Sequence, residues 1–272
     1  MNKAASTKDC NMIVNAATAC YPGIRHDKAV SLLVSGTSEP ALGKLSVGHI
    51  QLCPQNFGAI DDVLIEKLKT IAPDTQFRLH ANVRAPINGQ PHWDASNFSS
   101  TTLPYFQEMA DVSKKLNAPA YSLHAGSRKN ASLASLIDTQ KTLQDMFEVP
   151  VAIEGLYPTV RDEYLVSTWA EYRWLMDNNV PYALDLSHLA ILAKKSKQIE
   201  SSLVLDLMTS DLCLEIHVSD NDGRSDSHLP LDRHPWWWES LVNARTINTR
   251  PVLFSEGNQL KGMPLKDRLN LK

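Results

Sequence analysis

Short apolar runs alternate with longer amphipathic segments along most of the chain. Apolar runs of roughly four to eight residues are typical of buried strands, and apolar residues at helical spacing are typical of helices. We therefore expect strands over residues 11–20, 45–52, 76–83, 120–125, 149–154, 182–186, 212–218 and 251–256. Helices are expected over 27–34, 61–72, 103–116, 133–147, 167–177, 201–208 and 237–244, with a short amphipathic segment in the tail.

The regular order of strand and helix predicts the architecture. Strands that alternate with helices form parallel β/α units, and eight such units close most simply into a (β/α)8 TIM barrel, with a doubly wound sheet as the alternative. At 272 residues, the chain has the length of one such domain. We expect a single barrel domain over 1–272, in which 1–9 are a frayed terminus. The long polar connection over 84–101 is either functional or a mere insertion.

Composition narrows the class of protein. The chain is 43% hydrophobic with a formal net charge of -3, so no bulk basic surface favours nucleic acid, although a local basic groove stays open. Its four cysteines lack CxxC spacing, which is typical of reduced intracellular thiols. No apolar run approaches the ~20 residues that span a bilayer, and we expect no leader peptide. We therefore expect a cytoplasmic protein that acts on a small-molecule substrate and not on a membrane.

The stretch over 214–231, LEIHVSDNDGRSDSHLPL, concentrates candidate metal ligands. An apolar strand delivers His217 at its end, a turn-forming Asp-Asn-Asp-Gly run follows, and Asp226 and His228 come two positions apart. Zinc, manganese and iron favour this mixture of imidazole nitrogen and carboxylate oxygen. The stretch predicts metal ligands, although a polar surface loop with incidental histidines would have the same sequence features.

Other expected strands end in residues of the same kinds. Together with this stretch, the candidate ligands are His80, His124, Glu154, Asp185, His188, His217, Asp226, His228 and Glu256. A barrel brings the C-terminal ends of its strands to one mouth, where active sites form. Singly buried charges are costly unless they are paired or bound to a metal. The pattern therefore predicts a multi-residue metal site at the barrel mouth.

The strand ends also resemble those of a known superfamily. The segments FRLHANV, YSLHAGS, VAIEG, YALDLSH, LEIHVSDNDG, DSHLPL and LFSEG are similar to segments of the xylose-isomerase-like TIM-barrel superfamily. That group includes sugar isomerases and epimerases and the endonuclease IV family. The resemblance covers residues 44–257, and its most specific parts are the D-x-x-H of Asp185 and His188 and the run over 217–230.

The resemblance implies two sets of metal ligands. Sugar isomerases and epimerases bind one or two divalent ions through residues that match Glu154, Asp185, His217 and Glu256. In them the two glutamates also move the substrate proton, and the residue that matches His188 helps to hold the sugar. Endonuclease IV holds three metals with further ligands, which match His80, His124, Asp226 and His228. Every position is filled here, so the resemblance implies up to three ions of zinc, manganese or iron.

Three clustered metals suit phosphoester hydrolysis, because one ion activates water and its neighbours stabilise the developing charge. We therefore expect hydrolysis of a small phosphorylated substrate, with Glu154 as the first candidate for a bridging carboxylate and Glu256 as the second. Two departures from endonuclease IV disfavour a DNA substrate. Residues 231–234 replace a G-E-G run, and Gly155 follows Glu154 where an amide side chain is common.

Three other functions stay open. A sugar or sugar-phosphate isomerase or epimerase would use Glu154 and Glu256 as acid and base, with His188 beside the substrate. A multinuclear iron enzyme that modifies a small peptide shares the resemblance. A non-catalytic metal-binding subunit would instead recruit a peptide or protein partner. The number and identity of the bound metals distinguish these functions.

Three further residues are candidates for substrate binding. Arg128 and Arg224 each follow a proposed ligand by a few residues, where the guanidinium fork would clamp a phosphate or carboxylate. A solvated surface arginine is the alternative. Trp237 lies in the run PWWW over 235–238. It either belongs to an aromatic wall over the substrate or packs beneath a helix.

Overall fold

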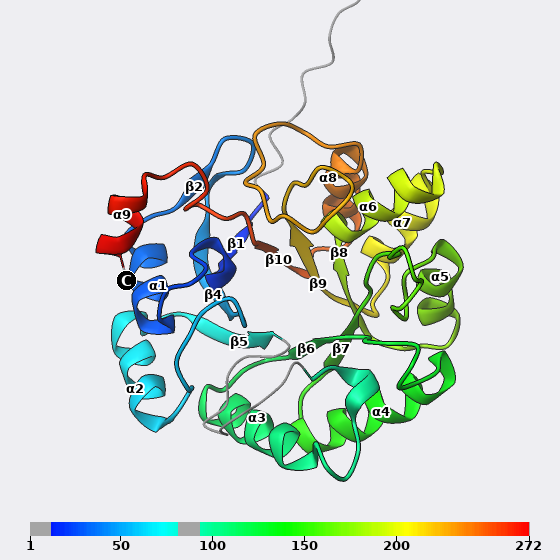
Figure 1. The fold of residues 1–272 in the computed structure, drawn as a ribbon, viewed down its shortest axis with the longest axis horizontal. Helices are drawn as coiled ribbons and strands as arrows, with labels where there is room; N and C mark the ends of the chain where they lie inside the picture. The colour runs from blue at the N-terminus through cyan, green and yellow to red at the C-terminus, as the bar shows by residue number, and fades with distance from the viewer. Residues whose placement is uncertain (1–11, 81–92, 272) are drawn as a thin grey trace, which may run out of the picture.

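The computed structural model describes residues 12–80 and 93–271. Within them, eight parallel strands close into a barrel (Figure 1). The barrel strands are β1 (Asn15–Ala17), β4 (Ser46–Leu52), β5 (Gln76–His80), β6 (Tyr121–His124), β7 (Val151–Glu154), β8 (Tyr182–Asp185), β9 (Cys213–Val218) and β10 (Val252–Ser255). Consecutive barrel strands pair with one another, and β10 closes the ring on β1. The expected (β/α)8 barrel is confirmed.

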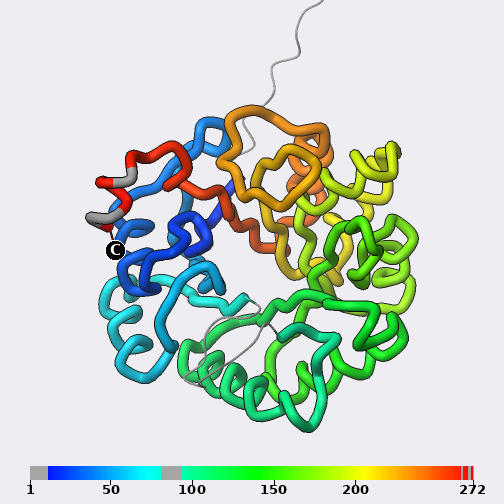
Figure 2. The backbone as a smooth tube through the Cα atoms, viewed as in Figure 1, coloured from blue at the N-terminus to red at the C-terminus, as the bar shows by residue number. Residues whose placement is uncertain are grey.

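Helices cover the outside of the barrel (Figure 2). They are α1 (His26–Val34), α2 (Asp62–Ile71), α3 (Leu103–Lys115), α4 (Leu133–Phe147), α5 (Trp169–Asp177), α6 (Leu186–Ser196), α7 (Ser201–Thr209), α8 (Trp238–Ile247) and α9 (Leu265–Asn270). The bounds of α4 agree with the sequence prediction because Ser132 and Ser135 form a capping box at its start. Two 3-10 turns, η1 (Thr18–Cys20) and η2 (Ala95–Asn97), and a small hairpin of β2 (Ser38–Glu39) and β3 (Gly43–Lys44) complete the described fold.

Strand register sets the height of residues at the barrel mouth. His124 on β6 pairs with Glu154 on β7, and Asp185 on β8 pairs with His217 on β9. Side chains of paired residues on neighbouring strands point to the same face of a sheet, while the next residue along each strand points to the other. Leu123, next to His124, is fully buried in the apolar core. The register therefore groups polar side chains on the inner face at one end of the barrel.

The structure differs from the sequence prediction in three elements. The first strand is short, because β1 ends at Ala17 and η1 follows it. Helix α6 was not predicted, because it begins directly after β8 with no loop residues between them. The hairpin of β2 and β3 was also missed, because its strands are too short to show a pattern. Residues 81–83 of the expected third strand and 84–92 of the long connection lie outside the described residues. Among the described helices, none is long and apolar enough to cross a membrane.

Candidate metal centre

The proposed metal ligands lie at the C-terminal ends of the strands. The last residues of β5, β6, β7 and β8 are His80, His124, Glu154 and Asp185. Strand β9 contributes His217 one residue before its end, and Glu256 directly follows β10. The first turn of α6 carries His188, and the loop after β9 carries Asp226 and His228. Parallel strands thus bring together residues that are far apart in sequence.

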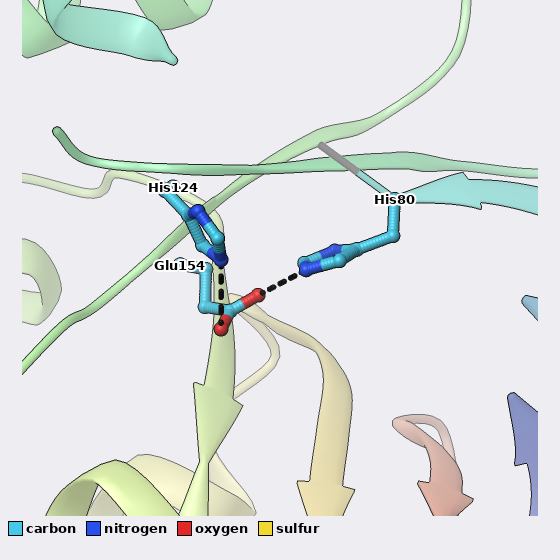
Figure 3. Close-up of side chains that lie close together, drawn as sticks. All are labelled: His80, His124 and Glu154. Atoms are coloured by element: carbon cyan, nitrogen blue, oxygen red, sulfur yellow. Dashed lines mark ion pairs between the residues drawn. The ribbon is translucent and has the colours of Figure 1, made fainter. Parts of the chain in front are cut away.

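Glu154 lies at the centre of this cluster. Its Oε2 atom is 3.3 Å from His80 Nε2 and 3.4 Å from His217 Nδ1. Its Oε1 atom is 3.6 Å from His124 Nε2 and 3.6 Å from His188 Nδ1. Figure 3 shows His80 and His124 approaching the two oxygens from different strands. Because Glu154 is only 1% exposed, imidazoles rather than water surround its carboxylate.

A second group of proposed ligands lies beside Glu154, over β8 to β10. His217 Nδ1, which faces Glu154, is also 3.8 Å from Glu256 Oε1. Asp185 uses its Oδ1 atom to accept hydrogen bonds from the backbone amides of Ser187 and His188, and it thereby caps α6. Its Oδ2 atom is 3.4 Å from His188 Nε2. Asp185 therefore starts a helix with one oxygen and keeps the other for the cluster.

His188, Asp226 and His228 form a third group. Asp226 Oδ2 is 2.9 Å from His228 Nε2 and 3.4 Å from His188 Nε2. Two backbone hydrogen bonds of 2.8 Å between Asp220 and Leu229 close the loop that carries these residues. Within it, His228 has a left-handed backbone with φ of 44°, which is unfavourable for a residue with a Cβ atom. The closed loop therefore holds His228 against Asp226 in a strained conformation.

Several atoms that face the cluster are buried without a hydrogen-bond partner among the described residues. They are Glu154 Oε2, His217 Nδ1, His228 Nδ1 and Glu256 Oε1. An unpaired buried polar group costs about 1–3 kcal/mol, and a bound cation would remove that cost. Groups whose ligand atoms lie within 4.8 Å of one another are His80, His124 and Glu154; His80, His217 and Glu256; and Glu154, Asp185 and His188. The nitrogen and oxygen donors present fit zinc, manganese or iron.

Hydrogen bonds behind the cluster decide which nitrogen of His188 faces it. His188 Nδ1 lies 2.9 Å from the carbonyl oxygen of Gly155, so this nitrogen donates and Nε2 is left for a metal. A side chain at Gly155 would collide with the ring of Tyr172. The glycine after Glu154, a departure from the amide that is common there, therefore makes room for the ring of Tyr172.

Burial and neighbouring charges shift the pKa values of the proposed ligands. Burial raises the pKa of Glu256 to about 7 and lowers that of His80 to about 3. Burial also disfavours the charged form of His228, but the carboxylates of Asp226 and Glu256 raise its pKa to about 9. Metals bind deprotonated ligands and must displace these protons. Metal affinity should therefore fall as the pH falls below about 9, the pKa of His228.

Comparisons with known proteins show which solved structures have a fold similar to that of this chain. No family model and no curated protein matches the chain. A D-tagatose 3-epimerase-like protein matches with a TM-score of 0.66 and 11% identity, over 96% of this chain and 94% of that one. An AP endonuclease of family 2 from Brucella melitensis matches with a TM-score of 0.62 and 15% identity, over 93% of this chain and 97% of that one. A xylose isomerase domain containing protein from Salmonella typhimurium matches with a TM-score of 0.59 and 12% identity, over 94% of this chain and 94% of that one.

The chain has a TIM-barrel fold similar to the fold of these three proteins. At these sequence identities the likeness concerns the fold, and the chemistry has to be argued from the site. The expected resemblance is confirmed at that level.

A cavity of about 580 Å³ opens beside the proposed metal ligands at the mouth of the barrel. Besides the cluster residues His124, His188 and Asp226, its lining includes Asp94, Tyr157 and Tyr164. Asp94 Oδ1 accepts hydrogen bonds from the backbone amide and the hydroxyl of Ser96, which orients the carboxylate. Sequence reasoning missed Asp94 and the two tyrosines, because they lie in irregular connections where no periodic pattern marks them.

The two candidate arginines do not line this cavity. The guanidinium of Arg128 donates to both carboxylate oxygens of Glu171, at 2.6 and 2.9 Å. Arg224 is exposed in the turn after β9. Substrate binding by Arg128 and Arg224 stays a prediction, and Glu171 already engages the fork of Arg128.

Trp237 does not face the cavity, and its expected contact with substrate is corrected to a packing role. Its side chain is 1% exposed and packs in the apolar core of the protein. The helix that follows, α8, begins at Trp238. The tryptophan run therefore divides between core and surface, because one helical turn cannot bury three adjacent side chains.

Replacing Trp237 with alanine should lower the free energy of unfolding by about 3–5 kcal/mol, because a large buried side chain leaves a cavity. Trp238→Ala is the matched control: Trp238 is half-buried and stacks on His234 at 4.1 Å, so its loss should cost less. Denaturant unfolding of both variants measures the difference. A stable Trp237→Ala variant with altered substrate affinity would restore the aromatic-wall interpretation.

Proposed function

We propose that this protein is a metal-dependent enzyme that holds three divalent ions at the barrel mouth and hydrolyses a phosphoester bond in a small phosphorylated molecule. The observation that supports it most is the position of Glu154, whose two oxygens lie within 3.6 Å of imidazoles from four different elements. A carboxylate in that position can bridge two ions. The separate group around Asp226 supplies ligands for a third.

The described residues supply three ligand sets, the first two of which share Glu154. The first is His80, His124 and Glu154, whose ligand atoms lie within 4.8 Å of one another. For the second we propose Glu154, Asp185, His217 and Glu256, because His217 Nδ1 is 3.4 Å from Glu154 and 3.8 Å from Glu256. The third is His188, Asp226 and His228. Each set has at least one carboxylate to balance the charge of an ion and at least one imidazole. Divalent ions bound there would supply water of lowered pKa and would neutralise charge that develops on a phosphoryl group.

The chain's own residues would hold the substrate over this centre. The cavity meets the cluster at His124, His188 and Asp226, so a phosphoryl group there would lie between the first and third ligand sets. Asp94 would accept hydrogen bonds from hydroxyl groups of the organic part, and the ring of Tyr157, 4.9 Å from His188, would form an apolar wall. A small polyol phosphate has the features that this lining can recognise.

A sugar isomerase or epimerase is the second candidate. The proteins of similar fold include epimerases as well as an endonuclease. Glu256, with its pKa raised to about 7, would suit proton transfer. That chemistry also needs Glu154 as the second proton carrier, and Glu154 is only 1% exposed behind its imidazoles. The enclosure of Glu154 favours a role as metal ligand over a role as proton carrier, and we therefore rank the isomerase second.

One assay distinguishes the two reactions. Metal-free protein is reloaded with zinc or manganese and incubated with p-nitrophenyl phosphate, bis-p-nitrophenyl phosphate and a panel of sugar phosphates in deuterated water. We expect release of nitrophenol or inorganic phosphate and no carbon-bound deuterium. Deuterium incorporation without phosphate release would contradict hydrolysis and establish the isomerase. Activity only with iron, oxygen and a peptide substrate would contradict both reactions and identify a peptide-modifying iron enzyme.

A further inference from the structure

A buried ion pair lies beneath the metal centre, inside the barrel. Arg78 Nη1 donates to Glu215 Oε1 at 2.8 Å, and their side chains are 7% and 0% exposed. Each residue precedes a proposed ligand by two positions, Arg78 before His80 and Glu215 before His217. Side chains two positions apart on a strand share a face, so the pair forms the layer directly below the ligands.

The second oxygen of Glu215 faces a metal ligand. Glu215 Oε2 is 3.3 Å from His217 Nε2 and accepts a hydrogen bond from the Gln51 amide at 2.9 Å. A carboxylate only accepts hydrogen bonds, so His217 Nε2 can bond to it only as a donor. The Gln51 amide nitrogen is also 3.2 Å from His217 Nε2, but its two hydrogens have acceptors in Glu215 Oε2 and Ser122 Oγ. These contacts assign the proton of His217 to Nε2. A neutral imidazole then has its lone pair on Nδ1. That atom is buried without a hydrogen-bond partner and faces Glu154 at 3.4 Å.

The same layer extends to a second ligand. The Gln51 amide also lies 3.3 Å from Ser122 Oγ, which in turn is 3.1 Å from His80 Nδ1. The Ser122 oxygen can accept from both neighbours. His80 then presents Nε2 to Glu154, at 3.3 Å. A continuous set of hydrogen bonds from Arg78 to Ser122 therefore lies under His217 and His80.

We propose that Glu215 is a positioning residue of the metal centre: it fixes the tautomer and ring orientation of His217 so that Nδ1 points to the metal, and Arg78 and Gln51 hold Glu215 in place. The proposal rests on the metal centre of the proposed function and not on the reaction that it catalyses. Stability alone does not account for the pair, because well-packed apolar residues stabilise a core as well as a buried ion pair or better. A carboxylate that orients a metal-bound histidine raises metal affinity.

Glu215→Gln tests the proposal, because it preserves the size of the side chain and removes its charge. The bound metals are titrated with a competing chelator, and metal equivalents and affinities are compared with those of the unsubstituted protein. We expect the affinity of the ions that share His217 to fall about 10–100-fold. Glu215→Asp should recover part of the loss, since it restores an anionic acceptor. Unchanged affinity in folded Glu215→Gln would overturn the proposal.

Two comparisons separate positioning from folding. Glu171→Gln is the matched control, because it breaks the ion pair with Arg128 outside the metal centre and should leave metal affinity unchanged. If Glu215→Gln does not fold, the double variant Arg78→Leu with Glu215→Leu removes the pair without leaving a lone buried charge. It should fold and still bind metal about 10–100-fold more weakly; wild-type affinity would overturn the proposal.

An unsubstituted protein that binds no metal would overturn this proposal and the proposed function together, whereas tight metal binding without hydrolysis overturns only the proposed function.

Discussion

Replacing Glu154 with glutamine should abolish turnover and empty most of the metal centre. The two oxygens of Glu154 face imidazoles of His80, His124, His188 and His217. An amide is neutral and donates hydrogen bonds where the ions need an anionic acceptor. Removing one electrostatic stabiliser costs about 10²–10³-fold in kcat, so a residue shared by two ions should cost about a thousandfold or more. Metal analysis and turnover with the best phosphoester measure both effects.

Glu163→Gln is the matched control for this variant. Glu163 lies in the connection after β7, its side chain is 49% exposed, and it pairs with Arg161 rather than with the cluster. We expect wild-type metal content and wild-type turnover in this variant. Substantial turnover in Glu154→Gln, with its metals retained, would show that the catalytic site lies elsewhere.

Replacing His124 with alanine should remove about one metal equivalent and spare the other two. His124 is at the edge of the cluster, with 29% of its side chain exposed, and it contacts Glu154 through Nε2. Its loss leaves the second and third ligand sets intact. We expect turnover to fall about 10²-fold or more, because one charge that stabilises the developing phosphoryl charge is gone. Elemental analysis of the purified variant gives the metal count.

His234→Ala controls for the loss of an imidazole. His234 is exposed, stacks on Trp238, and lines a surface pocket with Asp222 rather than the cavity beside the cluster. This variant should retain every metal. If His124→Ala also retains every metal, the first ligand set does not bind an ion, and the one-metal or two-metal centre of an isomerase becomes the better account.

The barrel and most of the residues of its candidate metal centre could be predicted from sequence, because both depend on local pattern. Short apolar strands ended in His, Asp or Glu, and a closed parallel barrel has only one place where such ends can meet. The limit of this reasoning appears at Asp185. It ends β8 and caps α6 at once, so strand and helix join without the loop residues that usually mark a boundary.

Residues that act through the barrel interior could not be found in the same way. Arg78 and Glu215 belong to different strands and meet only when the barrel closes, 137 positions apart in the chain. The one local signal is that each stands two residues before a histidine, which places both on the inner face. For Trp237 the sequence suggested a contact with substrate, but the side chain is buried. An aromatic run near the barrel mouth has the same sequence whether it packs inward or faces substrate.

The metal content of the protein purified without chelator tests the central claim most directly. Elemental analysis should find about three equivalents of divalent metal per chain, because the three ligand sets are all present at the mouth of the barrel. Three equivalents that fall toward two in His124→Ala would support the claim that His124 helps to bind one of three ions. One equivalent, or none after reloading with zinc, manganese or iron, would contradict it.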